Sequence, residues 1–458
     1  MTRRYGLLDA RPSPPVGRGR GAANADRARL RFAVLVAAAM VAAGCGPSQP
    51  RAAPPRPNAS VPGQTTAPGQ STAPPPASNE AGAFTASVGV LPPPASAWPS
   101  AGHDARHSSG VTATVIGPRT AHQRWTRKLE GNVTPGPVLG ADGTIYAASN
   151  AGVLHALDPA TGADRWTFDG GGSYGSDLSV SPAVLGDGTI LWPAPHNRLV
   201  ALDATGHQLW HETFGGFVLS PAVAGAGRVY VADQNGGVAA IEVGNATHNV
   251  VWQTDIGGTS YTSPTVGPDG TIVVGADNDL VGLADDGPAS RVRWRWHGPA
   301  QIEVSAAVAP DGTAIVGPNN EFTYGIGPDG AQRWKYRKGD WSYSSVVATP
   351  DGKAWFGDHL GFLDTVDAAT GNEVRRHATI PKSEPHPGGV GVWTMPAIDG
   401  TGAAYFGTVV GHVYGVGPDG ARLFDLDVGS TVDSYPALGA DGTLYIGSSD
   451  GVLHAIGA

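Results

Sequence analysis

The sequence predicts an all-β fold, an eight-bladed β-propeller made of four-stranded antiparallel blades. Two markers predict it: a tight glycine turn and a large side chain that ends each repeat, each with eight positions along the chain. The offset between the two series further indicates a closed ring. The composition agrees, because 67 glycines, 39 prolines and only 15% charged residues are typical of many short strands joined by tight turns.

The first marker is a turn ending in glycine between two apolar runs. Asp-Gly at such a place is a strong hairpin signal, because both residues tolerate the positive φ of a tight turn. The spacing of 39 to 50 residues fits four strands per blade. The eight turns, six of them Asp-Gly, lie at 142–143, 187–188, 226–227, 269–270, 311–312, 351–352, 401–402 and 441–442.

The second marker is an aromatic residue near the end of each repeat, with the polar pair Arg375-Arg376 in the remaining slot. A buried tryptophan removes a large apolar area from water, and its indole N–H finds a carbonyl partner. The aromatic residues of this series are Trp125, Trp166, Trp210, Trp252, Trp294, Trp334 and Phe424.

The aromatic series starts one marker ahead of the turn series. Trp125 precedes the first turn, and no aromatic marker follows the last turn at 441–442. We therefore expect the strand around Trp125 to complete the last blade, which begins near Tyr435. Closing the ring in this way removes the open sheet edges that a linear array would expose, whereas a solenoid would need polar caps at both ends.

The segment ALDPATGADRW at 156–166 resembles the tryptophan-docking motif of the pyrroloquinoline-quinone (PQQ)-like repeat family, the quinoprotein alcohol dehydrogenase-like propellers. Variants of it stand at 201–210 and 365–375, and the opening WPSAGHDARHSSG at 98–110 is similar to the lead-in of such propellers. The resemblance covers residues 98–458. It implies that the seven aromatic markers have a structural role, each docking one blade on the next.

Residues 1–44 are predicted to be a lipoprotein signal peptide. A basic stretch precedes an apolar run at 32–43, which is too short to cross a hydrocarbon core of about 30 Å. The junction VAAGC resembles the bacterial lipobox, which implies that Cys45 is the lipid attachment site. A lone cysteine forms no internal disulfide; the alternative is a soluble signal peptide followed by a chance cysteine.

Residues 45–97 are rich in proline, alanine, serine and threonine, so we expect a disordered linker ahead of the propeller at 98–458. The protein is then exported and anchored in a membrane, facing the periplasm or the cell exterior. Residues 1–44 hold eight arginines and two aspartates, which leaves 22 basic and 37 acidic residues in the rest. This acidic balance argues against nucleic acid as a partner.

Enzymatic chemistry finds little support in the sequence. The resemblance implies that a PQQ-dependent dehydrogenase would be a longer chain with a calcium-ligating set of Glu, Asn and Asp and, commonly, two adjacent cysteines. This chain has one cysteine. The G-x-S-x-G pattern at 171–175 lacks a strand-turn-helix context. Neither the histidines nor the acidic run at 276–287 has metal-ligand spacing. We expect no catalytic residue, metal or cofactor, with PQQ and calcium as the alternative.

The segments that join each outer strand to the next inner strand are expected to converge on one face, around the mouth of the central channel. They carry aromatic and acidic residues, which we interpret as a rim that binds a peptide, a sugar or a cationic group. The alternative is that these side chains only pack at the ends of the inner strands. The rim candidates are Tyr174, Asp177, Phe217, Tyr261, Glu303, Trp341, Tyr343, Trp393, Asp433 and Tyr435.

These features together favour a lipid-anchored interaction scaffold or ligand-binding module over an enzyme. The combination is similar to the outer-membrane assembly lipoproteins of the BamB type, which implies another envelope protein, or a peptide or glycan, as the partner. A PQQ-dependent or other propeller-based oxidoreductase or lyase is the alternative, because a fold does not by itself decide function.

Overall fold

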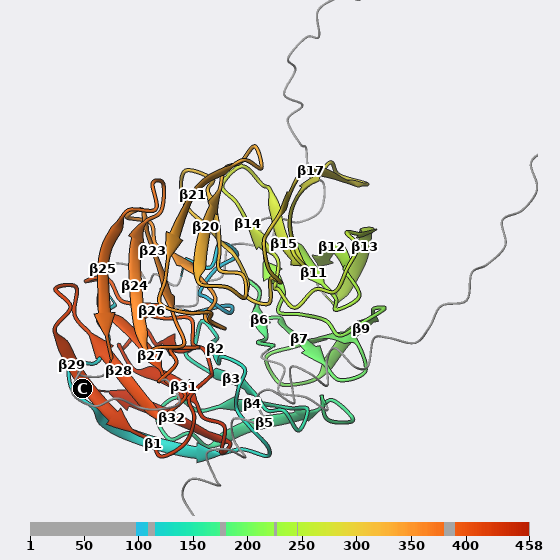
Figure 1. The fold of residues 1–458 in the computed structure, drawn as a ribbon. Helices are drawn as coiled ribbons and strands as arrows, with labels where there is room; N and C mark the ends of the chain where they lie inside the picture. Colours follow the sequence, from blue (N-terminus) through green and yellow to red (C-terminus); the bar gives the residue numbers. More distant parts are fainter. Residues whose placement is uncertain are drawn as a thin grey trace, which may run out of the picture. The chain divides into compact units, whose positions relative to one another are not determined.

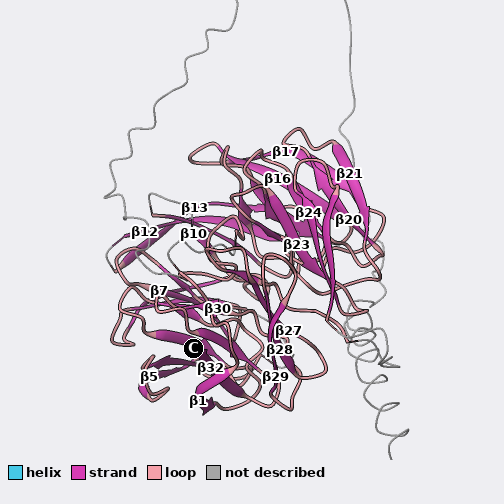
Figure 2. Ribbon diagram, turned by 90° about the vertical axis from the view of Figure 1, so that its left-hand side faces the viewer, coloured by secondary structure: helices cyan, strands magenta, loops and turns pink. Residues whose placement is uncertain are grey.

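The computed structural model describes residues 98–108, 115–174, 180–223, 227–244, 246–379 and 390–457. In these residues eight four-stranded antiparallel sheets stand in a ring and form an eight-bladed β-propeller (Figure 1). The predicted fold class is thereby confirmed. Seen from the side, the described part consists of strands and loops (Figure 2). No helix in this part is long and apolar enough to cross a membrane.

Each blade has a short inner strand at the channel and a second strand beside it. The inner strands of blades 1 to 8 are β2 (Val138–Leu139), β6 (Ala183–Val184), β10 (Ala222–Val223), β14 (Thr265–Val266), β18 (Ala307–Val308), β22 (Val347–Ala348), β26 (Ala397–Ile398) and β30 (Ala437–Leu438). The second strands are β3 (Ile145–Ala148), β7 (Ile190–Ala194), β11 (Arg228–Ala232), β15 (Ile272–Ala276), β19 (Ala314–Val316), β23 (Lys353–Gly357), β27 (Ala404–Gly407) and β31 (Leu444–Gly447).

The third and fourth strands lie farther from the channel. The third strands are β4 (Val153–Leu157), β8 (Arg198–Leu202), β12 (Gly237–Gly244), β16 (Asp279–Asp285), β20 (Phe322–Ile326), β24 (Phe362–Asp367), β28 (His412–Val416) and β32 (Val452–Gly457). The outer strands are β5 (Asp164–Asp169), β9 (Gln208–Thr213), β13 (Thr247–Asp255), β17 (Ser290–His297), β21 (Gln332–Arg337), β25 (Glu373–Ala378), β29 (Arg422–Asp427) and, for blade 8, β1 (His122–Lys128).

The hydrophobic core lies between neighbouring blades, and the burial of the strands follows from their place. Second strands such as β7 (ILWPA) are buried at every residue, because both of their faces meet other blades. Outer strands such as β21 (QRWKYR) alternate, with the tryptophan buried and its neighbours exposed. This period of two is what the zigzag of an extended chain requires when only one face is covered.

The N-terminal strand β1 closes the ring, as predicted. It pairs antiparallel with β32, and Trp125 lies opposite Ala455 in that pairing. Blade 8 therefore joins residues from both ends of the described chain (Figure 1).

The propeller has two faces, which we name by their connections. The loop face carries the segments from each outer strand to the next inner strand and the turns between second and third strands. The turn face carries the Asp-Gly turns between inner and second strands. There Gly143 has φ +81°, and the Asp142 carboxylate accepts the backbone N–H of Thr144 at 3.0 Å, so both residues of the motif serve the turn.

The lead-in segment Trp98–Ser108 lies across the turn-face ends of the inner strands. Its backbone carbonyls accept N–H groups from blades 1, 2, 4, 5 and 6, so one short segment ties together most of the ring. Trp98 is 1% exposed. The bonded pairs are Trp98–Leu139 (2.8 Å), Pro99–Val184 (2.7 Å), Ala105–Val266 (2.7 Å), Arg106–Val308 (3.3 Å) and His107–Ala348 (3.2 Å).

The chain then reaches blade 7 before it enters β1. The carbonyl of Val115 accepts the N–H of Gly400 at 2.9 Å, and the buried Asp399 carboxylate lies 3.0 Å from the guanidinium of Arg119. The lead-in and these residues therefore bind blades 1, 2, 4, 5, 6 and 7 on the turn face.

Candidate functional site

The aromatic markers lie at the joints between blades. Four indole N–H groups donate to the following blade: Trp125 to the carbonyl of Pro159 (2.9 Å), Trp166 to Ala204 (2.9 Å), Trp252 to the Asp285 carboxylate (2.9 Å) and Trp334 to Ala368 (3.1 Å). The motif glycine of the next blade touches the ring, since a Cβ on Gly162 would lie 2.6 Å from Trp125.

The other joints use variations on this contact. Trp210 stacks on His248 of blade 3, with ring centroids 4.1 Å apart. A Cβ on Gly330 would lie 2.5 Å from Trp294, and Phe424 stacks on Tyr405 within blade 7. In blade 6, Arg375 occupies the position of the aromatic marker and lies opposite Thr365 in the strand pairing.

Sequence reasoning missed a set of arginine side chains on the turn face, which we call the arginine clamps. In four blades the residue before the docking tryptophan is an arginine whose guanidinium bonds the Asp and Thr of the blade's own Asp-Gly turn. The signal that could have found them is the Arg-Trp dipeptide, which occurs five times; four copies form clamps, and the fifth, Arg295-Trp296, does not. The ion pairs are Arg124–Asp441 (2.8 Å), Arg165–Asp142 (2.8 Å), Arg293–Asp269 (2.6 Å) and Arg333–Asp311 (2.9 Å).

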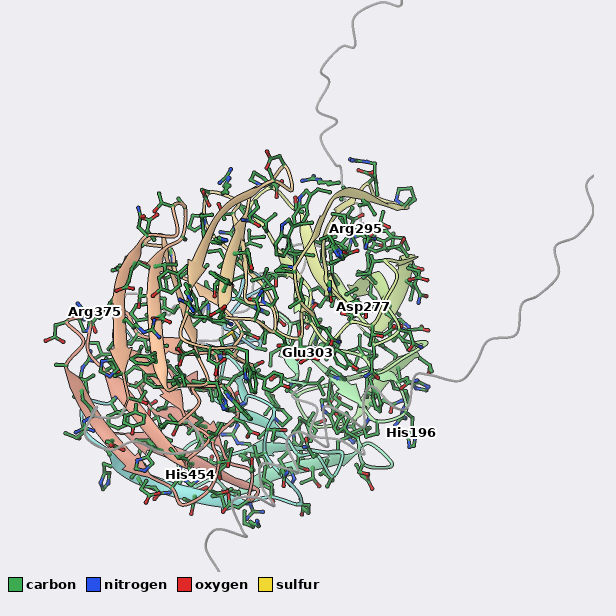
Figure 3. All side chains as sticks on the ribbon, viewed as in Figure 1. His196, Asp277, Arg295, Glu303, Arg375 and His454 are labelled. Atoms are coloured by element: carbon green, nitrogen blue, oxygen red, sulfur yellow. The ribbon has the colours of Figure 1, made fainter. Side chains whose placement is uncertain are left out.

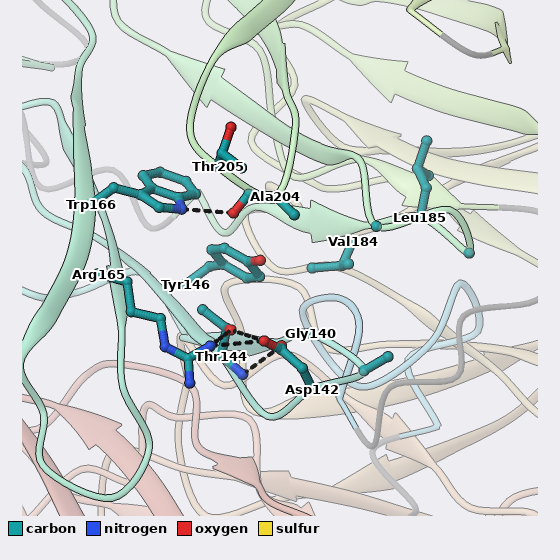
Figure 4. A pocket seen from close by; sticks show the side chains of 13 residues that line it. Gly140, Asp142, Thr144, Tyr146, Arg165, Trp166, Val184, Leu185, Ala204 and Thr205 are labelled. Atoms are coloured by element: carbon teal, nitrogen blue, oxygen red, sulfur yellow. Dashed lines mark hydrogen bonds and ion pairs between the residues drawn. The ribbon is translucent and has the colours of Figure 1, made fainter.

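In three of these clamps the pKa of the carboxyl group lies below its ordinary value, at Asp142, Asp269 and Asp441. Partial burial raises the pKa of Asp142, but hydrogen bonds from Thr144 and Arg165 outweigh it and leave that pKa below its ordinary value. Figure 4 shows the clamp beside a groove between blades 1 and 2, lined also by Tyr146 and Trp166. At these four turns the carboxylate is therefore paired with a guanidinium.

The rim candidates of the loop face occupy a repeated position. Five of them lie four residues before the first residue of their inner strand: Tyr261, Glu303, Tyr343, Trp393 and Asp433. Because the blades repeat around the axis, this position forms a ring at the channel mouth. Figure 3 shows Glu303 near the middle of the propeller, whereas Arg375 and His454 lie toward its edge.

The other rim candidates lie elsewhere. Tyr174 is 4% exposed, and its hydroxyl donates to the carbonyl of Pro193 in the core, so it offers no surface at the mouth. Phe217 packs against the core of blades 1 to 4. Asp177 and the lipid site Cys45 lie outside the described residues.

Tyr435 belongs to the channel wall rather than to the rim. It lies two residues before its inner strand, a position where blades 2 to 6 have serine. Neighbouring serines are linked, as when the N–H of Ser263 donates to Ser305 Oγ at 2.9 Å. The Tyr435 hydroxyl meets Ser345 Oγ at 3.2 Å, and Met395 at the same position of blade 7 is 2% exposed.

Blades 6 and 7 bring four rings into contact on the loop face. The centroid of Trp341 lies 5.2 Å from that of Tyr343 and 6.0 Å from that of Trp393, and Tyr343 meets Trp393 edge-on at 5.3 Å. His359 stacks on Trp341 at 4.6 Å and on Trp393 at 5.8 Å. We call Trp341, Tyr343, His359 and Trp393 the ring cluster; all four are partly exposed.

His359 was not among the sequence candidates. It lies in the turn after β23. Its backbone N–H donates to the backbone carbonyl of Trp341 at 3.0 Å, which places His359 beside the rings. In blades 1, 3, 7 and 8 the equivalent position holds Asn150, Gln234, Val409 and Ser449, so the repeat offered no signal for a histidine here. Its Nδ1 is buried without a partner, as is Nε1 of Trp393.

Glu303 of blade 5 lies beside the cluster and carries an unusual neighbour. Its carboxylate accepts the amide N–H of Asn319 at 2.6 Å, which directs the amide nitrogen toward Glu303 and leaves Asn319 Oδ1 buried without a partner. Burial raises the pKa of the Tyr343 hydroxyl, and the negative charge of Glu303 adds to the effect. The Glu303 carboxylate and the unpartnered Oδ1 of Asn319 thus lie near the ring cluster.

Comparisons with known proteins agree with the fold. The chain matches the family described as outer membrane protein assembly factor BamB over residues 109–213, 173–249 and 195–347, which together span more than half of its 458 residues. Two solved structures are similar at 16% identity, which shows the fold alone. BamB from Moraxella catarrhalis has a TM-score of 0.56, covering 74% of this chain and 100% of that one. Quinohemoprotein alcohol dehydrogenase from Comamonas testosteroni has a TM-score of 0.60, covering 78% and 80%.

Two curated relatives match shorter segments. The quinohemoprotein alcohol dehydrogenase of Comamonas testosteroni is 32% identical over 146 residues, which is 29% of this chain and 20% of that protein. The serine/threonine-protein kinase AfsK of Streptomyces griseus is 36% identical over 117 residues, 23% of this chain and 14% of that protein. The matches thus span a fifth or less of these relatives. With its matched residues and its eight blades, the chain belongs to the PQQ-like repeat propeller family described as outer membrane protein assembly factor BamB.

Proposed function

We propose that this protein is an exported, lipid-anchored propeller that binds another envelope protein through its loop face. The observation that carries the proposal is the ring cluster, in which Trp341, Tyr343 and Trp393 stay partly exposed while touching one another. Aromatic side chains grouped at a surface are typical anchors of protein interfaces. Membership of a family described as an outer-membrane assembly factor supports an envelope setting.

The lipid anchor of the proposal is Cys45, which follows the apolar run of the signal peptide. Replacing it by serine keeps the size of the side chain and removes the sulfur that takes the lipid. We expect the wild-type chain to incorporate labelled palmitate and to fractionate with membranes, and the Cys45→Ser variant to do neither. Labelling of the variant at the wild-type level would refute this part.

Capture of a partner in the native envelope tests the scaffold function. Full-length protein is crosslinked in its native host and purified, and the copurifying envelope proteins are compared between variants. We expect the double variant Trp341→Ala, Trp393→Ala to lose the main crosslinked partner. The matched control is Val292→Ala with Val374→Ala, two apolar residues 49% and 50% exposed on outer strands, which should keep it. Retention by the tryptophan variant would sink the proposal.

PQQ-dependent oxidation is the second candidate, favoured by the 146-residue match to a quinohemoprotein alcohol dehydrogenase. The mouth residues do not fit a calcium-bound quinone. Asn319 directs its amide nitrogen, not its oxygen, at Glu303, and in the described part of the chain no three His, Cys, Asp or Glu side chains group as metal ligands. Dye-linked oxidation of alcohols or sugars with added PQQ and calcium, above background, would reverse this ranking.

A further inference from the structure

We propose that the ring cluster and Glu303 bind an arginine or lysine side chain that a partner protein presents. This inference rests on the proposed function and names the chemistry that the partner must bring.

The residue at the rim position, four residues before each inner strand, differs among four successive blades. It runs from Glu303 in blade 5 through Tyr343 and Trp393 to Asp433 in blade 8, so two aromatic rings lie between two carboxylates. Trp341 contacts both rings from the segment before β22. The faces of aromatic rings carry negative potential and attract cations within about 6 Å of the centroid. Rings and carboxylates here favour the same sign of ligand charge.

The acceptors at Glu303 favour a cation that carries N–H groups. Asn319 Oδ1 lies buried without a partner next to a carboxylate that already uses the amide N–H of Asn319. A sugar hydroxyl could satisfy the carbonyl oxygen but would leave the carboxylate charge without a counterion. A quaternary ammonium would balance the charge but could donate nothing. A guanidinium or ammonium group does both.

The pairing of the Glu303 carboxylate points to the same conclusion. On the turn face, arginine clamps neutralise the Asp-Gly turns, for example Arg165 on Asp142. On the loop face the pairing differs from place to place: Asp358 pairs with Arg376 at 3.2 Å, whereas the recorded partner of Glu303 is the neutral amide of Asn319. Glu303 is therefore a carboxylate beside the rings whose recorded partner is uncharged, and its charge attracts a basic group.

Two exposed apolar residues indicate that the cation comes from a polypeptide. Leu360 is 49% exposed and Val410 is 39% exposed, and they lie in the equivalent turns of blades 6 and 7, the blades that hold the ring cluster. The side chains that flank an arginine or lysine in an extended peptide would cover this apolar surface, whereas a free amine would not.

The test measures binding of a fluorescein-labelled nonapeptide, (Leu-Arg-Gly) repeated three times, to the full-length protein in detergent by fluorescence anisotropy. The matched probe replaces each arginine by citrulline, which keeps the shape and removes the charge. We expect the arginine peptide to bind at least about tenfold more tightly, with an affinity that falls as salt is added.

Three variants locate the site. Trp341→Leu should weaken binding of the arginine peptide by about 2- to 30-fold, the range of a cation-π contact, and Trp341→Phe should weaken it less, because it keeps a ring. Glu303→Gln should remove the preference for arginine over citrulline. Val292→Ala, at a residue 49% exposed on outer strand β17, should change neither affinity. Thermal unfolding midpoints near that of the wild type establish that the variants fold.

The outcomes separate this inference from the proposed function. Equal affinity for the arginine and citrulline peptides, or unchanged binding in both Trp341→Leu and Glu303→Gln, overturns the cation inference. If Glu303→Gln keeps the crosslinked envelope partner while the double tryptophan variant loses it, the scaffold function stands and the inference that the site binds a cation is wrong. If neither variant alters capture, both proposals fail.

Discussion

Trp334 and Trp294 offer a matched test of how the blades are held together. Each is 8% exposed, and each faces a glycine of the third strand, where a Cβ on Gly325 or Gly282 would come within 2.2 Å of the indole. They differ in one respect. The indole N–H of Trp334 donates to the carbonyl of Ala368 in the next blade at 3.1 Å, whereas Trp294 Nε1 is buried without a partner.

Replacing each tryptophan by phenylalanine removes similar apolar volume, so the packing loss largely cancels between the two variants. Trp334→Phe also loses a hydrogen bond and leaves the buried Ala368 carbonyl without a donor, at a cost of about 1 to 3 kcal/mol. Trp294→Phe removes a donor that had no partner and carries no such cost. We therefore expect Trp334→Phe to lower the free energy of unfolding by about 1 to 3 kcal/mol more than Trp294→Phe.

Urea unfolding followed by circular dichroism measures both variants, and equal m-values establish that the two unfolding reactions expose the same surface. Losses that agree within about 0.5 kcal/mol would show that the indole hydrogen bonds add nothing to the blade joint. A larger loss for Trp294→Phe would reverse the argument.

Three further predictions concern the ring. Gly162 has φ +70° and lies against Trp125, so Gly162→Val should lower the unfolding midpoint measured by calorimetry, and a wild-type midpoint would contradict the docking geometry. Deleting the lead-in Trp98–Ser108 removes hydrogen bonds to five inner strands, so the variant should be cleaved faster in limited proteolysis; an unchanged rate would show that the lead-in does not brace the ring. Burial, only partly offset by Arg376, raises the pKa of Asp364 to about 7, so the folded state binds the proton more tightly and its stability falls as pH rises from about 4 to 7. Asp364→Asn should flatten this loss in urea unfolding at several pH values, and an unaltered pH dependence would exclude Asp364 as its source.

Much of the architecture was predictable because its signals are local and repeated. The Asp-Gly turns need only a few residues to form, and the offset of Trp125 from the first turn indicated the closing strand that pairs with β32. The Arg-Trp dipeptides were equally visible, yet their role depends on an Asp and a Thr elsewhere in the same blade. These lie 23 and 21 residues before Arg165, but 317 and 319 residues after Arg124.

The candidate site was predictable only in part. Rim segments could be assigned to one face from strand order alone, and this brought Glu303, Tyr343 and Trp393 to equivalent positions. The same reasoning included Tyr174, which the structure buries in the core, and it omitted His359, which stacks on Trp341. The direction of a side chain in an irregular segment depends on its neighbours, and the repeat carries no information about it.

By itself the sequence determined the number of blades, their four-stranded form and the closure of the ring, because hydrogen-bonded turns and alternating burial act over short stretches of chain. Only the tertiary structure decided which side chains meet at the mouth. Tyr343 and Trp393 are 50 positions apart in the chain, and they touch because each lies four residues before an inner strand of adjacent blades. Within blade 5, the fold also brings Asn319 to Glu303 and leaves Asn319 Oδ1 buried without a partner, which no local sequence pattern indicates.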